Sequence, residues 1–217
     1  MSDNIDSLSS LTRREISTIR EICSIAVAQA AGTLSKLMDI GVTLSVPDLH
    51  VLPPEEMSSL FGEMNVSAVG VLIPFRGDIQ GNMLLLFPDD GAGELNRILF
   101  PQGGVENREL VDSAFREIGN ILSGVFLTIL SRLSGQIILN LPPIIARDMA
   151  GALLDAILAD IGSTSDRIIA LSSSMEDSSE NPLVKVVIIP DPGGLDLFLK
   201  AGKRLVKLDR SSHGSGE

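Results

Sequence analysis

The sequence contains no tryptophan and no tyrosine, one cysteine, two histidines and fewer basic than acidic residues. With seven phenylalanines as its aromatic rings, the chain has little on which nucleobases or sugars could stack. The single cysteine, Cys23, excludes a disulfide within the chain, and Cys23 with His50 and His213 is too small a set for a zinc site. Aliphatic side chains must therefore build the core, and Cys23 is expected to be a small buried apolar residue.

Charge and hydropathy restrict the partners and the location. The 17 basic and 28 acidic residues leave a formal charge of −11, which argues against nucleic acid and an anionic membrane as partners. The N-terminus is acidic where a signal peptide is basic, and no uninterrupted apolar run approaches the roughly 18 residues of a membrane span. P-loop, dinucleotide-binding and Gly-x-Ser-x-Gly motifs are missing. We therefore expect a cytoplasmic protein whose partners are proteins or small molecules.

The most informative stretch is a predicted long helix at residues 107–133. At about 100° per residue, Ser113, Glu117, Asn120 and Gly124 fall within an arc of roughly 60°, and apolar residues fill most of the remaining circumference. A solvated face normally carries long charged residues at each turn. A stripe of a hydroxyl, a carboxylate, a carboxamide and a gap instead indicates a surface shaped to receive a partner, although an ordinary amphipathic helix is the alternative.

The pattern of helices and strands occurs twice. The first half is predicted to contain a long helix, a strand, a short helix, two strands and a short helix, at 12–39, 42–46, 53–61, 66–75, 79–87 and 89–100. In this half, Pro47 ends the first strand, and the Asp89-Asp90 pair is expected to cap the last helix without holding a metal. The second half repeats the order at 107–133, 137–141, 146–161, 167–172, 183–189 and after Gly193, with a mobile loop at 173–182.

Individual residues match between the halves. Ser17 precedes Ser113 by 96 residues, and Pro47 precedes Pro142 by 95. A repeat of this length is too long for a solenoid unit, so we predict one α+β domain with pseudo-twofold duplication and a monomeric state. In this fold the two long helices pack on a continuous, antiparallel-rich β-sheet formed edge to edge from both halves. The single domain spans residues 1–217, with repeat halves at 12–100 and 107–203 and a disordered tail at 204–217.

The motif in the second half resembles a known signature. Ser113, Glu117 and Asn120, followed after 21 residues by Pro142, fit the pattern of Asp or Ser, Glu, Asn and Pro in the CheC/CheX/FliY family of chemotaxis phosphatases. The duplicated architecture is similar to the CheC type in particular. This resemblance implies an enzyme of signal transduction that hydrolyses the aspartyl phosphate of a CheY-type response regulator.

The resemblance also implies roles for the residues. Glu117 would contact the active-site region of the regulator, and Asn120 would hold the attacking water in line with phosphorus. Ser113, Gly124 and Pro142 would support the site. The chain itself would bind no metal, because Mg²⁺ is expected in the partner regulator, and a positioned carboxamide suffices for an already activated phosphoryl group.

The first half departs from the signature. Ser17 and Glu21 are present, but Ser24 stands where the motif requires Asn, and Pro47 follows it after 22 residues. A serine side chain is too short to place a water where a carboxamide does. We therefore expect one competent site, on the second long helix, and a degenerate first site.

Other functions are compatible with the resemblance. The main alternative is a non-catalytic adaptor that binds a CheD-type receptor deamidase through the short helix at 146–161. A rotor-associated FliM/FliY type is less favoured, because no further domain follows residue 203. A CheX type is also less favoured, because those proteins are single units that dimerise.

Overall fold

The computed structural model describes residues 13–39, 43–161, 168–176 and 182–191. Within these ranges eight strands form one antiparallel sheet in the order β1-β7-β8-β4-β3-β5, in which β2 also pairs with β7 and β6 with β3. The strands are β1 (Thr43–Leu44), β2 (Asp48–Leu52), β3 (Ser67–Gly77), β4 (Gly81–Pro88), β5 (Ile138–Asn140), β6 (Ile144–Met149), β7 (Ile168–Glu176) and β8 (Pro182–Pro190).

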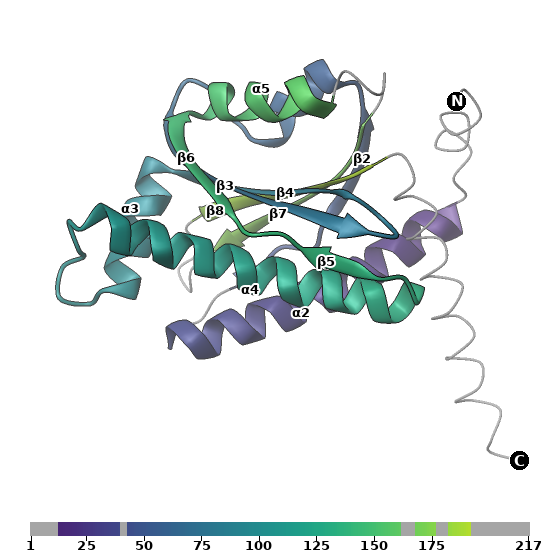
Figure 1. Ribbon diagram of the computed structural model, residues 1–217, viewed down its shortest axis with the longest axis horizontal. Helices are drawn as coiled ribbons and strands as arrows, with labels where there is room; N and C mark the ends of the chain where they lie inside the picture. Colours follow the sequence, from purple (N-terminus) through teal and green to yellow (C-terminus); the bar gives the residue numbers. More distant parts are fainter. Residues whose placement is uncertain (1–12, 40–42, 162–167, 177–181, 192–217) are drawn as a thin grey trace, which may run out of the picture.

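Helices cover both faces of this sheet. The two long helices, α2 (Arg13–Met38) and α4 (Arg108–Ser134), lie side by side over one face, and α5 (Ala150–Ile161) lies over the other (Figure 1). The short 3-10 helix η2 (Pro54–Leu60) joins α5 on that second face, and α3 (Asp89–Leu99) follows β4. The sheet is thus sandwiched between two helical layers and buried on both sides.

The strand sequences show why both faces are apolar. In β3, Val69, Val71 and Ile73 belong to the core cluster shared with α2 and α4, because alternate side chains of a strand point to the same face. In β4, Leu84 and Leu86 point the other way and join the cluster beneath η2 and α5. Long apolar runs in the central strands therefore produce two hydrophobic cores, one on each side of the sheet.

Pairing between β4 and β8 joins the two halves of the chain. Leu85 lies opposite Val186 in an antiparallel register, which makes the sheet continuous across the halves. The predicted α+β class and continuous antiparallel sheet are confirmed, as are the hairpin of β3 and β4 and the extent of α4. The edge of β4 in the first half pairs with the edge of β8 in the second half, so neither strand leaves unpaired backbone groups at the centre of the sheet.

The predicted helix at 146–161 is wrong over its first turn. Residues 146–149 belong to strand β6, which pairs with β3 so that Ile145 lies opposite Val71, and α5 begins at Ala150. The local sequence of alanine, arginine, aspartate and methionine does not favour a strand. The free edge of β3 supplies backbone hydrogen bonds that override this local preference.

The predicted short helix after Pro53 is confirmed and has 3-10 geometry. Three smaller predictions need correction. Strand structure does not end at Pro47, because β2 follows it and pairs with β7. Helix α3 has Pro88 at its N-cap without a side-chain cap bond, so Asp89 and Asp90 lie in its first turn, where they act on the helix dipole. The predicted loop at 173–182 is a strand as far as Glu176.

Some predictions fall outside the described residues. These are the helix start at Thr12, the helix after Gly193 and the disordered tail at 204–217. They stay predictions.

Helix α4, with 27 residues, is long and apolar enough to pass for a membrane span by length and composition. Half of the most apolar segment is buried inside the fold, among side chains that contact α2 and the sheet. Its apolar character is therefore accounted for by its place in the core.

Candidate active site

Helix α4 carries the predicted site, and its ends are defined by local signals. The Asn107 side chain accepts hydrogen bonds from the backbone N–H groups of Glu109 and Leu110, at 3.1 and 3.2 Å. At the other end Gly135 adopts the left-handed conformation, with φ of 69°, and closes the last turn. These two caps fix the length of the helix on which Ser113, Glu117 and Asn120 are displayed.

The predicted stripe lies on the outer surface of α4. Ser113, Glu117 and Asn120 are exposed, whereas Gly119 and Ser123 on the adjacent side of the helix are buried. Among the described residues, none makes a hydrogen bond or an ion pair with the Glu117 carboxylate or the Asn120 carboxamide. Both groups therefore keep their full bonding capacity for a partner outside the chain.

The far end of the stripe meets the strand that follows α4. A Cβ placed on Gly124 would lie 3.7 Å from the Asn140 Nδ2, so β5 passes directly beside the helix at this point. Pro142 is exposed and lies two residues beyond Asn140, within about 7 Å along the chain. The structure thus brings Gly124 and the segment leading to Pro142 together, beyond the turn that carries Asn120.

The first long helix presents a different surface. Ser17 and Glu21 are exposed on α2, but Ser24 is half-buried and its hydroxyl donates a 2.7 Å hydrogen bond to the Arg20 carbonyl one turn back. A serine bonded in this way is turned toward its own helix. The Ser24 hydroxyl is therefore not available to hold a water at the surface.

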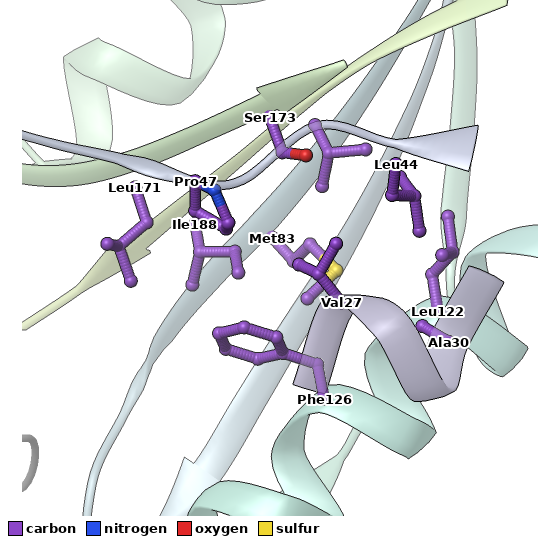
Figure 2. Close-up of a pocket in the computed structure, with 11 residues that line it drawn as sticks. Val27, Ala30, Leu44, Pro47, Met83, Leu122, Phe126, Leu171, Ser173 and Ile188 are labelled. Atoms are coloured by element: carbon purple, nitrogen blue, oxygen red, sulfur yellow. The ribbon is translucent and has the colours of Figure 1, made fainter. Parts of the chain in front are cut away.

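Pro47, the predicted counterpart of Pro142, is buried. It lines an apolar cavity of about 20 Å³ between α2, α4 and the sheet, together with Val27, Leu44 and Phe126 (Figure 2). This volume is close to that of one water molecule, and apolar walls leave such a cavity dry. Pro47 and Pro142 thus occupy different environments, and the cavity offers no site for a ligand.

Metal and thiol chemistry find no support in the described part of the chain. No three His, Cys, Asp or Glu side chains are grouped there as a metal ion would require. Cys23 is fully buried in the core, and this burial raises the pKa of its thiol to about 12. The predicted role of Cys23 as a small apolar core residue agrees with this burial.

Sequence reasoning did not identify the polar residues that connect α4 to the edge of the sheet. Asn140 donates a hydrogen bond from Nδ2 to Ser123 Oγ at 2.8 Å, and Arg147 pairs with Asp112 through two guanidinium nitrogens, Nε at 3.2 Å from Oδ1. The signal for Asn140 was its position, as a carboxamide at the end of the apolar run Ile-Ile-Leu. Its partner on α4 could not be identified from spacing alone.

The fold and this stripe together define a class: an α+β protein whose long helix displays a carboxylate and a carboxamide that have no partner in the described part of the chain. Comparison with known proteins narrows this class. The family described as chemotaxis phosphatase CheX matches residues 69–150, a range that contains Glu117, Asn120 and Pro142. The CheY-P phosphatase CheC of Bacillus subtilis is 25% identical over 203 residues, which cover 90% of this chain and 97% of that protein.

Solved structures agree on the fold. FliY of Thermotoga maritima superposes with a TM-score of 0.67 at 23% identity, covering 91% of this chain and 98% of that one. CheX of Borrelia burgdorferi, solved in complex with CheY, BeF3 and Mg²⁺, has a TM-score of 0.51 at 16% identity and covers 78% and 97%. The similarity of this chain to the CheC/CheX/FliY family, indicated by its motif, is thereby confirmed.

Proposed function

We propose that this protein is a phosphatase that hydrolyses the aspartyl phosphate of a CheY-type response regulator in the cytoplasm. The observation that carries the proposal is the stripe on α4, where Glu117 and Asn120 are exposed on one side of the helix without partners among the described residues. The relationship to CheC supports the reaction, and the complex of the related CheX with CheY supports the type of partner.

The chemistry requires little from this chain. An aspartyl phosphate is already activated, and the Mg²⁺ that neutralises its charge is held by the regulator. The carboxamide of Asn120 can accept one hydrogen bond from a water and donate another, which orients that water for in-line attack without proton transfer to the side chain. The Glu117 carboxylate, one turn earlier, supplies a negative group that can pair with a cation beside the phosphoryl group and fix the docked pose.

The remaining residues of the motif serve the approach of the two proteins. Gly124 leaves space on the stripe, and Pro142 limits the flexibility of the exposed segment beside it. Ser113 lies one turn before Glu117 and extends the polar surface toward the N-terminus of α4. The regulator would thus meet one side of a rigid helix, and the chain would act as a monomer.

A duplicated origin of the fold is consistent with the strand order. On one side of the central β4–β8 pair lies β3, followed by β5 and β6, the two short strands that come after α4 in the chain. On the other side lies β7, followed by β1 and β2, the two short strands that come after α2. We infer that residues 12–100 and 107–203 are repeat halves, of which the second holds the competent site. The first keeps Ser17, Glu21 and Pro47 but has Ser24 bonded to its own helix.

The test is the decay of phosphate on a purified CheY-type regulator with Mg²⁺. We expect the wild-type protein to accelerate decay, and Asn120→Ala to lower the rate by about 10²-fold because the water loses its orientation. Glu117→Ala should weaken the reaction through the docked pose. Glu55→Ala, which removes an exposed carboxylate from η2 on the opposite face of the sheet, is the matched control and should leave the rate unchanged.

The same assay separates the phosphatase from the adaptor. An adaptor for a CheD-type partner would use α5, whose exposed side carries Ala152, Asp155 and Ala156 while Leu153 and Leu154 are buried in the core. Such a protein would be indifferent to Glu117→Ala and Asn120→Ala. Decay that is unchanged by wild type and all variants would refute the phosphatase proposal for the regulator tested.

A further inference from the structure

A hydrogen-bonded chain runs from the edge of the sheet to the backbone of the proposed catalytic turn. Asn140 on β5 donates from Nδ2 to Ser123 Oγ at 2.8 Å. The Ser123 hydroxyl donates in turn to the Gly119 carbonyl at 2.7 Å, and the Asn120 carbonyl lies 3.3 Å from the same oxygen. A carboxamide on one element thus reaches, through one buried hydroxyl, the peptide groups that carry Asn120.

The direction of these bonds is fixed by the number of protons. The single Ser123 hydroxyl proton is used on the Gly119 carbonyl, so the oxygen can only accept from the Asn140 amide group. This orients the other atom of the carboxamide, Asn140 Oδ1, which is buried and has no hydrogen-bond partner among the described residues. The Asn140 carboxamide thus contributes one hydrogen bond to the fold together with an unmet buried acceptor, which offsets the stability that the bond supplies.

The first half of the chain shows the apolar alternative. Ninety-six residues before Ser123 and Asn140 stand Val27 and Leu44. The ladders support this spacing for the strands, because Leu44 pairs with Met175 as Asn140 pairs with Phe75, and Asp48 pairs with Ser172 as Ile144 pairs with Leu72. Both line the apolar cavity beside α2, on a helix and a strand in the same order as α4 and β5 (Figure 2). An apolar pair therefore occupies these positions in the half that lacks the catalytic carboxamide, and a hydrogen-bonded pair occupies them in the half that has it.

We propose that Asn140 and Ser123 are positioning residues for Asn120. They fix the rotation and depth of α4 at the Gly119–Asn120 peptide, and so the point in space that the Asn120 carboxamide reaches. The inference rests on the proposed phosphatase function. Positioning matters because the rate depends steeply on geometry: a displacement of about 1 Å at the reacting groups can lower it on the order of a hundredfold.

The experiment uses the full-length protein, a phosphorylated CheY-type regulator and Mg²⁺, and compares Ser123→Ala, Asn140→Leu and the double variant with wild type. We expect kcat to fall by about tenfold or more in all three, with KM within about twofold, since the docking stripe itself is unchanged. Asn140→Leu removes the orphaned acceptor, so its melting temperature should equal or exceed that of wild type. Ser123→Ala should be less stable, and the double variant should regain stability without regaining rate.

The matched control is Ser134→Ala. Ser134 is also buried on α4 and donates to a carbonyl one turn back, Leu130 O at 2.6 Å, but it lies four turns from Asn120. Its loss should lower stability and leave kcat unchanged. If the double variant recovers rate together with stability, or if Asn140→Leu keeps full kcat while Asn120→Ala is inactive, the positioning role is refuted and the phosphatase stands. If wild type itself leaves decay unchanged, the proposed function fails and this inference fails with it.

Discussion

Gly119 offers the sharpest test of how closely α4 approaches the sheet. A Cβ built on this residue would lie 3.1 Å from Val71 Cγ1 and 3.2 Å from Ile73 Cδ1. Both neighbours are fully buried and β-branched, so their side chains have little freedom to rotate away. Gly119→Ala must therefore compress the core beneath the proposed catalytic turn or lift the helix.

The magnitude follows from two opposing terms. Alanine in a helix interior is favoured over glycine by about 1 kcal/mol, while overpacking a rigid core costs about 1–3 kcal/mol. Gly119→Ala should thus change the free energy of unfolding by between zero and about 2 kcal/mol of destabilisation. Gly32 on α2 is the matched control, because its Cβ would meet nothing within 4 Å, and Gly32→Ala should stabilise by about 0.5–1 kcal/mol.

Urea and thermal unfolding of the two variants measure this difference. We expect their free energies of unfolding to differ by about 0.5–3 kcal/mol, a difference that shifts the melting temperature by roughly 2–4 °C per kcal/mol. The phosphatase rate of Gly119→Ala should also fall, since Asn120 is the next residue. Equal stabilisation by both substitutions would show that α4 does not rest on β3 at Gly119.

Two further predictions concern the core and the edge of the sheet. The Cys23 thiol should resist alkylation until the protein unfolds, and labelling of the native protein at pH 8 would contradict its burial. The free energy of unfolding should fall as pH rises from about 9.0 toward 12, because the native thiol keeps a proton that the unfolded thiol loses. Below pH 9.0 the thiol is protonated in both states, so its full contribution to stability is present. The ion pair of Asp112 and Arg147 is partly buried, with side chains 16% and 29% exposed. A double-mutant cycle to alanine should therefore give a coupling free energy of about 1–2 kcal/mol. A coupling near zero would show that the pair does not hold β6 to α4.

The long helix and its polar stripe could be predicted because both depend on local periodicity. Asn107 and Gly135 marked the ends of α4 within one residue, and the period of 3.6 placed Glu117 and Asn120 on one side. The hairpin of β3 and β4 was equally local, because two apolar runs flank a short turn.

Strand β6 could not be predicted in the same way. Apart from Ile145, its residues count as exposed, and apolar and polar residues do not alternate along it, so its sequence has no strand signature. They are extended because β3 has an open edge at Val69 and Val71, and hydrogen bonds to that edge outweigh local preference. The same limitation applies to Asp89 and Asp90, whose capping role was wrong because the backbone of Pro88 already begins the helix.

By itself the sequence determined the helix that displays Glu117 and Asn120, the apolar strands, and the absence of a carboxamide at Ser24. These properties follow from residue type and from spacing of a few positions along one element. Only the tertiary structure decided that Asn140 lies against Ser123, and that Gly119 rests on β3. The reason is that such contacts depend on the register and depth at which separate elements pack, and these are set by the whole core rather than by any one segment.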